Sequence, residues 1–274
     1  MARKLIFLLA FIIIILLGLI YSYFTKKSPV TGKGETLREF TFSSPKSLKE
    51  WDEKVLSQKS TGYSVEKLDE KSCIKAVSED SASALFYKEK LSCKRDPFLR
   101  WKWKAEVFPE HKKIETLYDK DEFDFVAQVY VVFSAKFFLN AKALQYVWTS
   151  DLPVGTVASS PYTKNVKVVV LQSGASEVWK EESRDIKADF RNFFGMELEK
   201  DIDAVAIMTD ADSTESTAVA YYTDIAFGYL ENDLKEDTAE NTDQKDNAVN
   251  DFSKKTNPEK VEVKNKKDVE IKED

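Results

Sequence analysis

The sequence predicts a mainly β protein: an antiparallel β-sandwich of the jelly-roll kind, with one or two short helices and one N-terminal transmembrane helix. Strand-like segments rich in aromatic and β-branched residues follow one another through about 190 residues, which is enough for one domain with a core. A single segment has a clear helical periodicity, and a long uncharged apolar run precedes the domain. Mostly antiparallel strands with few helices favour a sandwich; a half-open barrel is the alternative.

The apolar run covers residues 5–24, LIFLLAFIIIILLGLIYSYF, and contains no charged residue. As a helix it would span roughly 30 Å, about the thickness of the hydrocarbon core of a bilayer. A cleaved signal peptide has a shorter apolar core, roughly 7–15 residues, and a small-residue cleavage site, whereas residues 21–25 read YSYFT. We therefore predict an uncleaved single-pass signal anchor, with a cleaved signal peptide as the alternative.

The flanks of the run bear on its orientation. Residues 1–4 form a short stub with Arg3 and Lys4, and Lys26 and Lys27 follow the run. The short stub favours an N-terminus in the cytoplasm and an exported soluble domain. Because the flanking positive charges nearly balance, a domain left in the cytosol is the alternative.

Three segments follow the anchor. Residues 25–38 are expected to form a flexible linker, and residues 39–230 the β-sandwich domain. Residues 231–274 are nearly all charged or amide residues, which cannot bury enough apolar surface to offset the entropy cost of ordering. We expect a disordered, solvated tail; a tail that binds a cationic partner is the alternative. The formal net charge of −6 and the lack of a dense basic patch argue against nucleic acid as a partner.

The clearest strand of the domain is 99–107, where strict alternation puts five residues on one face: Leu99, Trp101, Trp103, Ala105 and Val107. Further strands are expected at 72–78, 84–91, 125–133, 142–149, 166–172, 204–208 and 218–227. One helix is predicted over 184–194, with Gly195 as its C-cap. A second, short helix is expected near 47–56.

Several blocks of the chain carry a family resemblance: LRWKW (99–103), AQVYVVF (127–133), LQYVW (144–148), SPYTKNVKVVVLQSG (160–174), WKEESRDIKADFRNFFG (179–195) and AIMTDADSTESTAVAYYTDI (206–225). In order and spacing they resemble the bacterial domain-of-unknown-function family 3047. The resemblance implies export and a galactose-binding-like jelly-roll architecture, but no activity. It makes the bacterial inner (cytoplasmic) membrane the expected location of the anchor, with the domain in the periplasm or outside.

Two positions depart from the pattern of that family. Gln128 stands where an Arg is expected, and residues 212–215 read DSTE where an Asp-Asn-Thr-Gly turn is expected. The first departure weakens any proposal of an Arg-centred site shared with the family.

A loop with two carboxylates is the first candidate for a site. The segment 209–214 follows a buried-looking strand and carries Asp210 and Asp212. These carboxylates could accept hydrogen bonds from sugar hydroxyls, or bind Ca²⁺, which prefers several oxygen ligands. The alternative is an Asx-type turn in which Asp212 caps the loop. We expect no cofactor, and Ca²⁺ is kept only as an alternative because the spacing is far from that of an EF-hand loop.

Arg184 lies at a predicted corner between a strand and the helix. We expect it to pair with Asp210 or Asp224 and to brace this corner. The alternative is a bidentate clamp on an anionic ligand.

Six aromatic residues on or near the strands could bind sugar rings or fill the core: Tyr130, Tyr146, Trp148, Trp179, Tyr221 and Tyr222. Tyr146 and Trp148 share one face of their strand, as Gln128 and Tyr130 do of theirs. A shared face allows a stacking platform, although such aromatics more often belong to the core.

Catalysis finds little support. His111 is the only histidine, lies in a polar loop and is expected to be solvated. No nucleophile motif, phosphate loop or dinucleotide fingerprint accompanies it. A carboxylate pair, Asp210 with Asp189 or Asp224, would be needed for glycoside hydrolysis.

Two cysteines, Cys73 and Cys93, are expected to be free thiols. A hairpin turning near Asp80 would hold them too far apart for a bridge. A disulfide in an exported domain is the alternative.

We therefore expect a non-enzymatic module that binds a glycan or another polar ligand of the cell envelope. The residues expected to hold that ligand are Gln128, Tyr146, Trp148, Arg184, Asp210 and Asp212. A structural or assembly protein of the envelope, in which these residues brace the sandwich, is the second hypothesis. A carboxylate-dependent glycoside hydrolase is the third.

Overall fold

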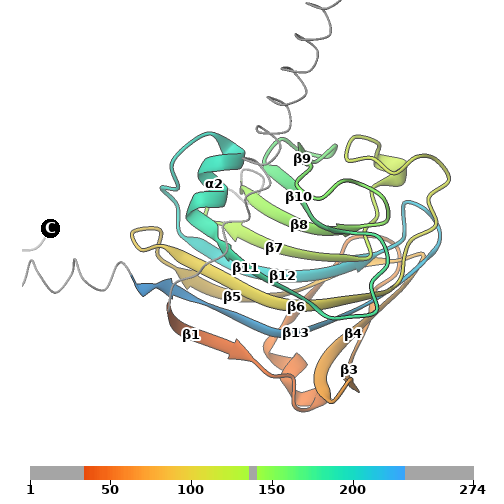
Figure 1. The fold of residues 1–274 in the computed structure, drawn as a ribbon, viewed down its shortest axis with the longest axis horizontal. Helices are drawn as coiled ribbons and strands as arrows, with labels where there is room; N and C mark the ends of the chain where they lie inside the picture. The colour runs from red at the N-terminus through yellow and green to blue at the C-terminus, as the bar shows by residue number, and fades with distance from the viewer. Residues whose placement is uncertain (1–33, 136–140, 232–274) are drawn as a thin grey trace, which may run out of the picture. The chain divides into compact units, whose positions relative to one another are not determined.

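Two β-sheets pack face to face in the computed structural model, which describes residues 34–135 and 141–231 (Figure 1). The predicted stub, the anchor over 5–24 and all but the first residue of the predicted tail lie outside the described residues. Within the described part of the chain, no helix is both long and apolar enough to cross a membrane.

The first sheet has six strands. Five of them follow the order β11–β6–β13–β4–β3, and the sixth, β1, pairs with the C-terminal part of β13, past the part that pairs with β4. Its strands are β1 Gly34–Phe40, β3 Gly62–Leu68, β4 Lys71–Glu79, β6 Pro97–Val107, β11 Lys180–Asp185 and β13 Thr217–Leu230. The predicted linker therefore ends earlier than expected, because residues 34–38 belong to β1. The close approach of β1 to β13 requires Gly228, where a Cβ would lie 1.9 Å from the carbonyl oxygen of Glu35.

The second sheet has seven strands in the order β2–β5–β12–β7–β8–β10–β9. Its strands are β2 Asp52–Val55, β5 Ala82–Leu91, β7 Ala127–Phe133, β8 Ala143–Thr149, β9 Val157–Ser159, β10 Val166–Ser173 and β12 Ile202–Asp210. β8 and β10 run parallel, and the other neighbours in this sheet are antiparallel. The predicted two-sheet, mainly antiparallel sandwich is thus confirmed, with one parallel pair.

The eight strands predicted from the sequence correspond to β4, β5, β6, β7, β8, β10, β12 and β13. The strands that the sequence pattern missed are β1, β2, β3, β9 and β11. Four of these are the edge strands of the two sheets. β2 is exposed along its whole length. β3 alternates only weakly: Tyr63 and Val65 pack on the core, but none of its residues is fully buried.

The core lies between the sheets and is crossed by aromatic contacts. Alternation along β6 points Trp101 and Trp103 inward, and both are fully buried. Trp101 lies 5.4 Å from Tyr146 and Trp103 lies 5.8 Å from Trp148, measured between ring centroids. Val107, expected on the same face, is instead 40% exposed at the end of the strand.

The predicted helix is present as α2, Ile186–Phe194. The carboxylate of Asp185 accepts a hydrogen bond from the backbone N–H of Ala188 at 2.9 Å, which caps the N-terminus. Gly195 ends the helix in the left-handed conformation, with φ of 67°. The second predicted helix is the shorter 3₁₀ turn η1, Pro45–Glu50, because the chain enters β2 at Asp52.

The predicted hairpin around Asp80 does not form. β4 belongs to the first sheet and β5 to the second, and the chain crosses between them at Asp80, where φ is 47°. Cys73 and Cys93 are free thiols, as expected; the first is buried and the second half-buried.

The two ends of the sandwich differ. α2 lies at one end of the strands, and the long connection from β6 to β7 lies at the other (Figure 1). This connection, residues 108–126, contains the 3₁₀ turn η2, Lys120–Glu122.

Candidate functional site

Two of the predicted ligand-binding residues meet on the outer face of the second sheet. Asp210 ends β12, and its Oδ1 accepts hydrogen bonds from the backbone N–H of Phe125 at 2.8 Å and from Nε2 of Gln128 at 2.5 Å. Oε1 of Gln128 in turn accepts from the Tyr130 hydroxyl at 2.8 Å and from Nε2 of Gln145 at 2.7 Å. Gln128 is fully buried, so these groups satisfy one another in a hydrogen-bonded chain across β12, β7 and β8.

Asp212 joins the same region through a residue that the sequence did not single out. One carboxylate oxygen from each of Asp124, Asp210 and Asp212 lies within 4.8 Å of the others. Asp124 accepts from the backbone N–H groups of Ser213 and Thr214, at 3.2 and 2.6 Å. The loop after β12 is therefore capped by Asp124 rather than by Asp212.

The electrostatics of this acidic cluster, Asp124, Asp210 and Asp212, favour a proton or a cation between the carboxylates. Burial, and then the charge of Asp124, raise the pKa of Asp210 well above its ordinary value, although two hydrogen bonds oppose the shift. Burial and Asp124 also raise the pKa of Asp212. Asp124 and Asp210 are both at least nine-tenths buried, whereas Asp212 is half-exposed.

Arg184 and Tyr146 belong to a second buried network, and the predicted partners of Arg184 are wrong. The guanidinium of Arg184 donates to both carboxylate oxygens of Asp189, at 2.7 and 2.5 Å. The hydroxyl of Tyr146 donates to the same carboxylate at 2.6 Å. Asp224, one of the expected partners, instead forms an ion pair with Lys102 at 2.9 Å. Arg184, in β11 (Lys180–Asp185), braces the start of α2, as expected, but its partner is Asp189 of α2.

The expected platform of Tyr146 and Trp148 is not exposed. Both side chains have no accessible surface and face the core. Nε1 of Trp148 donates to the carbonyl oxygen of Gly174 at 2.9 Å. The core alternative thus describes both residues.

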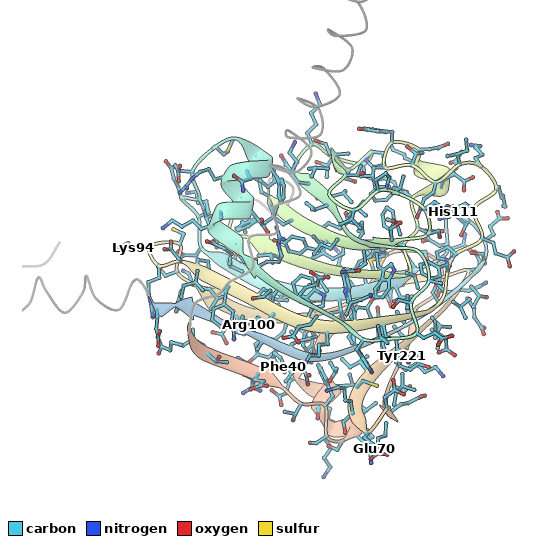
Figure 2. The ribbon with its side chains drawn as sticks, viewed as in Figure 1. Phe40, Glu70, Lys94, Arg100, His111 and Tyr221 are labelled. Carbon is cyan, nitrogen blue, oxygen red and sulfur yellow. The ribbon has the colours of Figure 1, made fainter. Side chains whose placement is uncertain are left out.

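A groove lies elsewhere, on the outer face of the first sheet, with a volume of about 520 Å³. Lys104 and Glu106 line it because they alternate with the inward-facing residues of β6. Tyr221 of β13 lines it from the neighbouring strand, where it is paired with Lys104. Phe108 after β6 and the segment 175–177 complete the walls. Figure 2 shows Tyr221 on this part of the fold.

Polar and aromatic groups meet in this groove. The Tyr221 hydroxyl donates to the carboxylate of Glu106, and burial together with Glu106 raises the pKa of Tyr221, so the hydroxyl stays a donor. Nζ of Lys104 donates to Asp69 at 2.9 Å, which lowers the pKa of Asp69. Trp179 packs edge-on against Tyr221, with 6.4 Å between ring centroids. Tyr221 is only 5% exposed, because Trp179 and Lys75, whose Nζ lies 5.8 Å from the ring centroid, pack against it. The groove therefore offers chiefly the carboxylate of Glu106 and the ammonium group of Lys104, beside a largely covered tyrosine.

None of the six predicted ligand-binding residues, all of which the structure describes, lines the groove. The signal for the groove was present in the sequence in two forms. Trp179 and Tyr221 are among the aromatics considered above, and the polar face of the alternating strand carries Lys104 and Glu106. The sequence does not show that these two features lie side by side.

The carboxylate pairs considered for hydrolysis do not form. Asp189 is bound to Arg184 and Asp224 to Lys102, on different parts of the fold from Asp210. The expectation of a solvated His111 is also wrong, because its side chain is only 8% exposed.

The fold and the groove define a small two-sheet β domain with a hollow on the outer face of its first sheet. The chain belongs to the family described as protein of unknown function DUF3047, whose pattern it matches over residues 49–226, in agreement with the resemblance seen in the sequence. A comparison with curated protein sequences gives no match.

Among solved structures, the chain is similar to the family 11 carbohydrate-binding module of the cellulase Lic26A-Cel5E of Clostridium thermocellum. The identity is 9%, the match covers 73% of this chain and 98% of the module, and the TM-score is 0.37. The chain is also similar to the mannan-recognising module TmCBM27, with 9% identity. That match covers 72% of this chain and 99% of the module, and its TM-score is 0.33. The K3 adhesin domain of Lys-gingipain from Porphyromonas gingivalis is similar with 11% identity. That match covers 71% of this chain and 99% of the domain, and its TM-score is 0.35.

Proposed function

We propose that this protein is a non-enzymatic binding module that holds a hydroxyl-rich ligand, such as an envelope glycan, in the groove on the first sheet. The observation that carries the proposal is that Glu106 and Lys104 line one hollow, with Glu106 held by the hydroxyl of the largely buried Tyr221. Its volume of about 520 Å³ falls within the range of roughly 300–1,000 Å³ that small-molecule sites occupy.

The chemistry of the groove suits a saccharide. Aromatic side chains present an apolar body with a polar tip, and sugar rings carry both apolar C–H faces and hydroxyl groups. The carboxylate of Glu106 can accept hydrogen bonds from hydroxyls, and the ammonium group of Lys104 can donate to them. The groove lies on two paired strands, β6 and β13, so the side chains are held by a rigid sheet rather than by loops.

The setting of the module follows from the sequence. In this proposal, residues 5–24 anchor the chain in the bacterial inner membrane with the N-terminus inside. The domain is then exported, as a jelly-roll-like module in the envelope.

One observation favours the second hypothesis, an envelope structural or assembly protein without a small ligand. The polar groups of the groove already pair with one another, Tyr221 with Glu106 and Lys104 with Asp69. A ligand must therefore compete with these contacts or accept hydrogen bonds at the remaining positions.

A thermal-shift screen of the full-length protein in detergent against oligosaccharides separates the two functions. A ligand that binds the native state raises the melting temperature. The rise should disappear in Glu106→Ala and persist in Glu53→Ala, a matched exposed glutamate on β2 of the other sheet. Loss of the rise in Asp212→Asn alone would move the site to the acidic cluster. No shift with any sugar would favour the structural role.

A further inference from the structure

His111 lies in the connection between β6 and β7, at the end of the sandwich opposite α2 and well apart from Tyr221 (Figures 1 and 2). It is the only histidine of the chain. Its side chain is only 8% exposed, although the segment around it is mostly polar. A buried imidazole in a polar loop needs partners, because burial of an unpaired polar group is costly.

Both ring nitrogens of His111 face a buried carboxylate. Nδ1 lies 3.3 Å from Oε2 of Glu122, in hydrogen-bond geometry. Nε2 lies 3.4 Å from Oε1 of Glu115, which is an ion-pair distance but not a formed hydrogen bond. The side chains of Glu115 and Glu122 are 3% and 2% exposed. A neutral imidazole carries one N–H and would turn a lone pair toward one of the two carboxylates, whereas an imidazolium presents an N–H to each.

The two glutamates connect the histidine to fixed backbone. Glu115 accepts hydrogen bonds from three consecutive N–H groups of the loop after β8, in residues 150–152, at 3.1, 2.8 and 3.3 Å. Glu122 accepts from the backbone N–H of Lys112 at 3.0 Å. His111 therefore lies between two carboxylates with different roles. Glu122 ties the segment to its own backbone, and Glu115 ties it to the loop after β8 of the second sheet.

We infer that the protonated His111 is a clasp that holds residues 109–122 against the loop after β8, and that loss of its proton loosens this segment. The inference does not depend on the groove or on its ligand. It assigns a pH-sensitive device to a residue that has no role in the proposed binding site.

The electrostatics give the direction of the response. Burial lowers the pKa of His111, but hydrogen bonding and the charges of Glu115 and Glu122 outweigh burial and raise it above the ordinary 6.5. Burial raises the pKa of Glu115, yet His111 and the backbone N–H groups bring it below its ordinary value. A histidine whose folded pKa is raised stabilises the fold fully below pH 6.5, and this contribution is lost as the pH rises through the folded pKa.

Other charged groups near the clasp are paired with each other. Lys112 binds Glu215 of the loop before β13 at 2.8 Å, and Lys113 binds Asp119 at 3.0 Å. Asp121 lies 3.8 Å from Lys113. The pKa values of Lys112 and Lys113 are raised and that of Asp119 is lowered, so these groups keep their charge between pH 6 and pH 9.

Loosening of the segment has a structural consequence beyond the loop. Leu117 and Phe123 of this connection pack on Val147, Val168 and Val170, which lie on the outer face of β8 and β10. Release of the segment would expose this apolar surface. In this inference, the segment covers this part of the second sheet while His111 is protonated and uncovers it when the pH rises and the proton is lost.

The test uses the full-length protein in detergent with histidine labelled for NMR, which gives one signal. The expected result is a titration midpoint above 6.5, and a lower midpoint in Glu115→Gln. In parallel, hydrogen exchange corrected for the intrinsic pH dependence should show a severalfold loss of protection in residues 109–122 and 150–152 between pH 6 and pH 9. Protection of α2 should stay constant over the same range.

A variant sharpens the result. His111→Gln cannot gain a proton, so protection of residues 109–122 should be low at both pH values. The wild-type series decides the question even where this variant folds poorly. A midpoint at or below 6.5, or unchanged protection of the segment from pH 6 to pH 9, would overturn the inference.

Discussion

Removing the carboxylate of Asp189 while Arg184 stays in place should cost about 3–5 kcal/mol of unfolding free energy, the usual cost of leaving one member of a buried pair uncompensated. Arg184 is 7% exposed and Asp189 1% exposed. Two charge-assisted hydrogen bonds of 2.7 and 2.5 Å join them, and Tyr146 adds a third to the same carboxylate. In Asp189→Leu the guanidinium loses both of these hydrogen bonds and its nearest charge, and only the charge of the buried Glu182 still favours it.

Urea unfolding followed by tryptophan fluorescence measures the effect. For a domain of this size the slope m is about 2–3 kcal/mol per M, so the midpoint for Asp189→Leu should fall by about 1–2.5 M. A triple variant, Arg184→Met with Asp189→Leu and Tyr146→Phe, removes the charge, its partner and the hydroxyl together. It should regain most of the lost stability, because an apolar replacement of a whole buried network is often neutral or stabilising.

Two results would refute this reasoning. A loss below about 1 kcal/mol for Asp189→Leu, the level of an exposed ion pair, would mean that water reaches Arg184. A triple variant as unstable as the single one would mean that the loss comes from packing at the start of α2 rather than from the unpaired charge.

Three further predictions concern other parts of the fold. Because burial raises the pKa of Asp210, the contribution of this group to stability should fall as the pH rises from 3.8 through the folded pKa, whereas carboxyls with a lowered pKa, such as Asp224, act in the opposite sense. The difference between Asp210→Asn and wild type isolates the contribution of Asp210: the variant should melt higher than wild type at pH 8 and equally at pH 4, and parallel pH profiles would argue against this. Burial raises the pKa of both thiols, that of Cys73 to about 11, but only Cys93 is partly exposed. A thiol reagent at pH 7.5 should therefore label Cys93 alone, and slowly, in the native protein and both cysteines in urea; labelling of neither in urea without reductant would reveal a disulfide. Gly228→Ala places a Cβ against the backbone of β1, so hydrogen exchange in residues 34–40 should speed up while that of β4 does not change; unchanged exchange of β1 would mean that the strand shifts without detaching.

The sequence predicted the strands that cross the core because burial leaves a simple pattern there. In β6, alternation separated Trp101 and Trp103 from the polar residues between them, and the structure confirms both faces. α2 was predicted from its apolar stripe and from Gly195, whose φ is positive. The edge strand β2 left no such pattern because all of its residues are exposed. β3 left only a short one, in which Tyr63 and Val65 are half-buried against the core.

The candidate site was harder to predict than the fold because its contacts join distant parts of the chain. Asp124 caps a loop that lies about 90 residues later, and no local signal marks it. Arg184 was predicted to brace the corner by pairing with Asp210 or Asp224, and the structure shows that Asp189 is its partner instead. Lys104 and Tyr221 meet because β6 pairs with β13, and the sequence does not reveal that strand order.

The central claim, that the groove on the first sheet binds a hydroxyl-rich ligand, is tested most directly by the footprint of a sugar identified in the thermal-shift screen. Hydrogen exchange of the full-length protein is compared with and without that sugar. The account predicts slower exchange in residues 104–108 and 175–179, which line or flank the groove, with no change in residues 124–130 and 210–216. Slower exchange around the acidic cluster, with none at the groove, would contradict it.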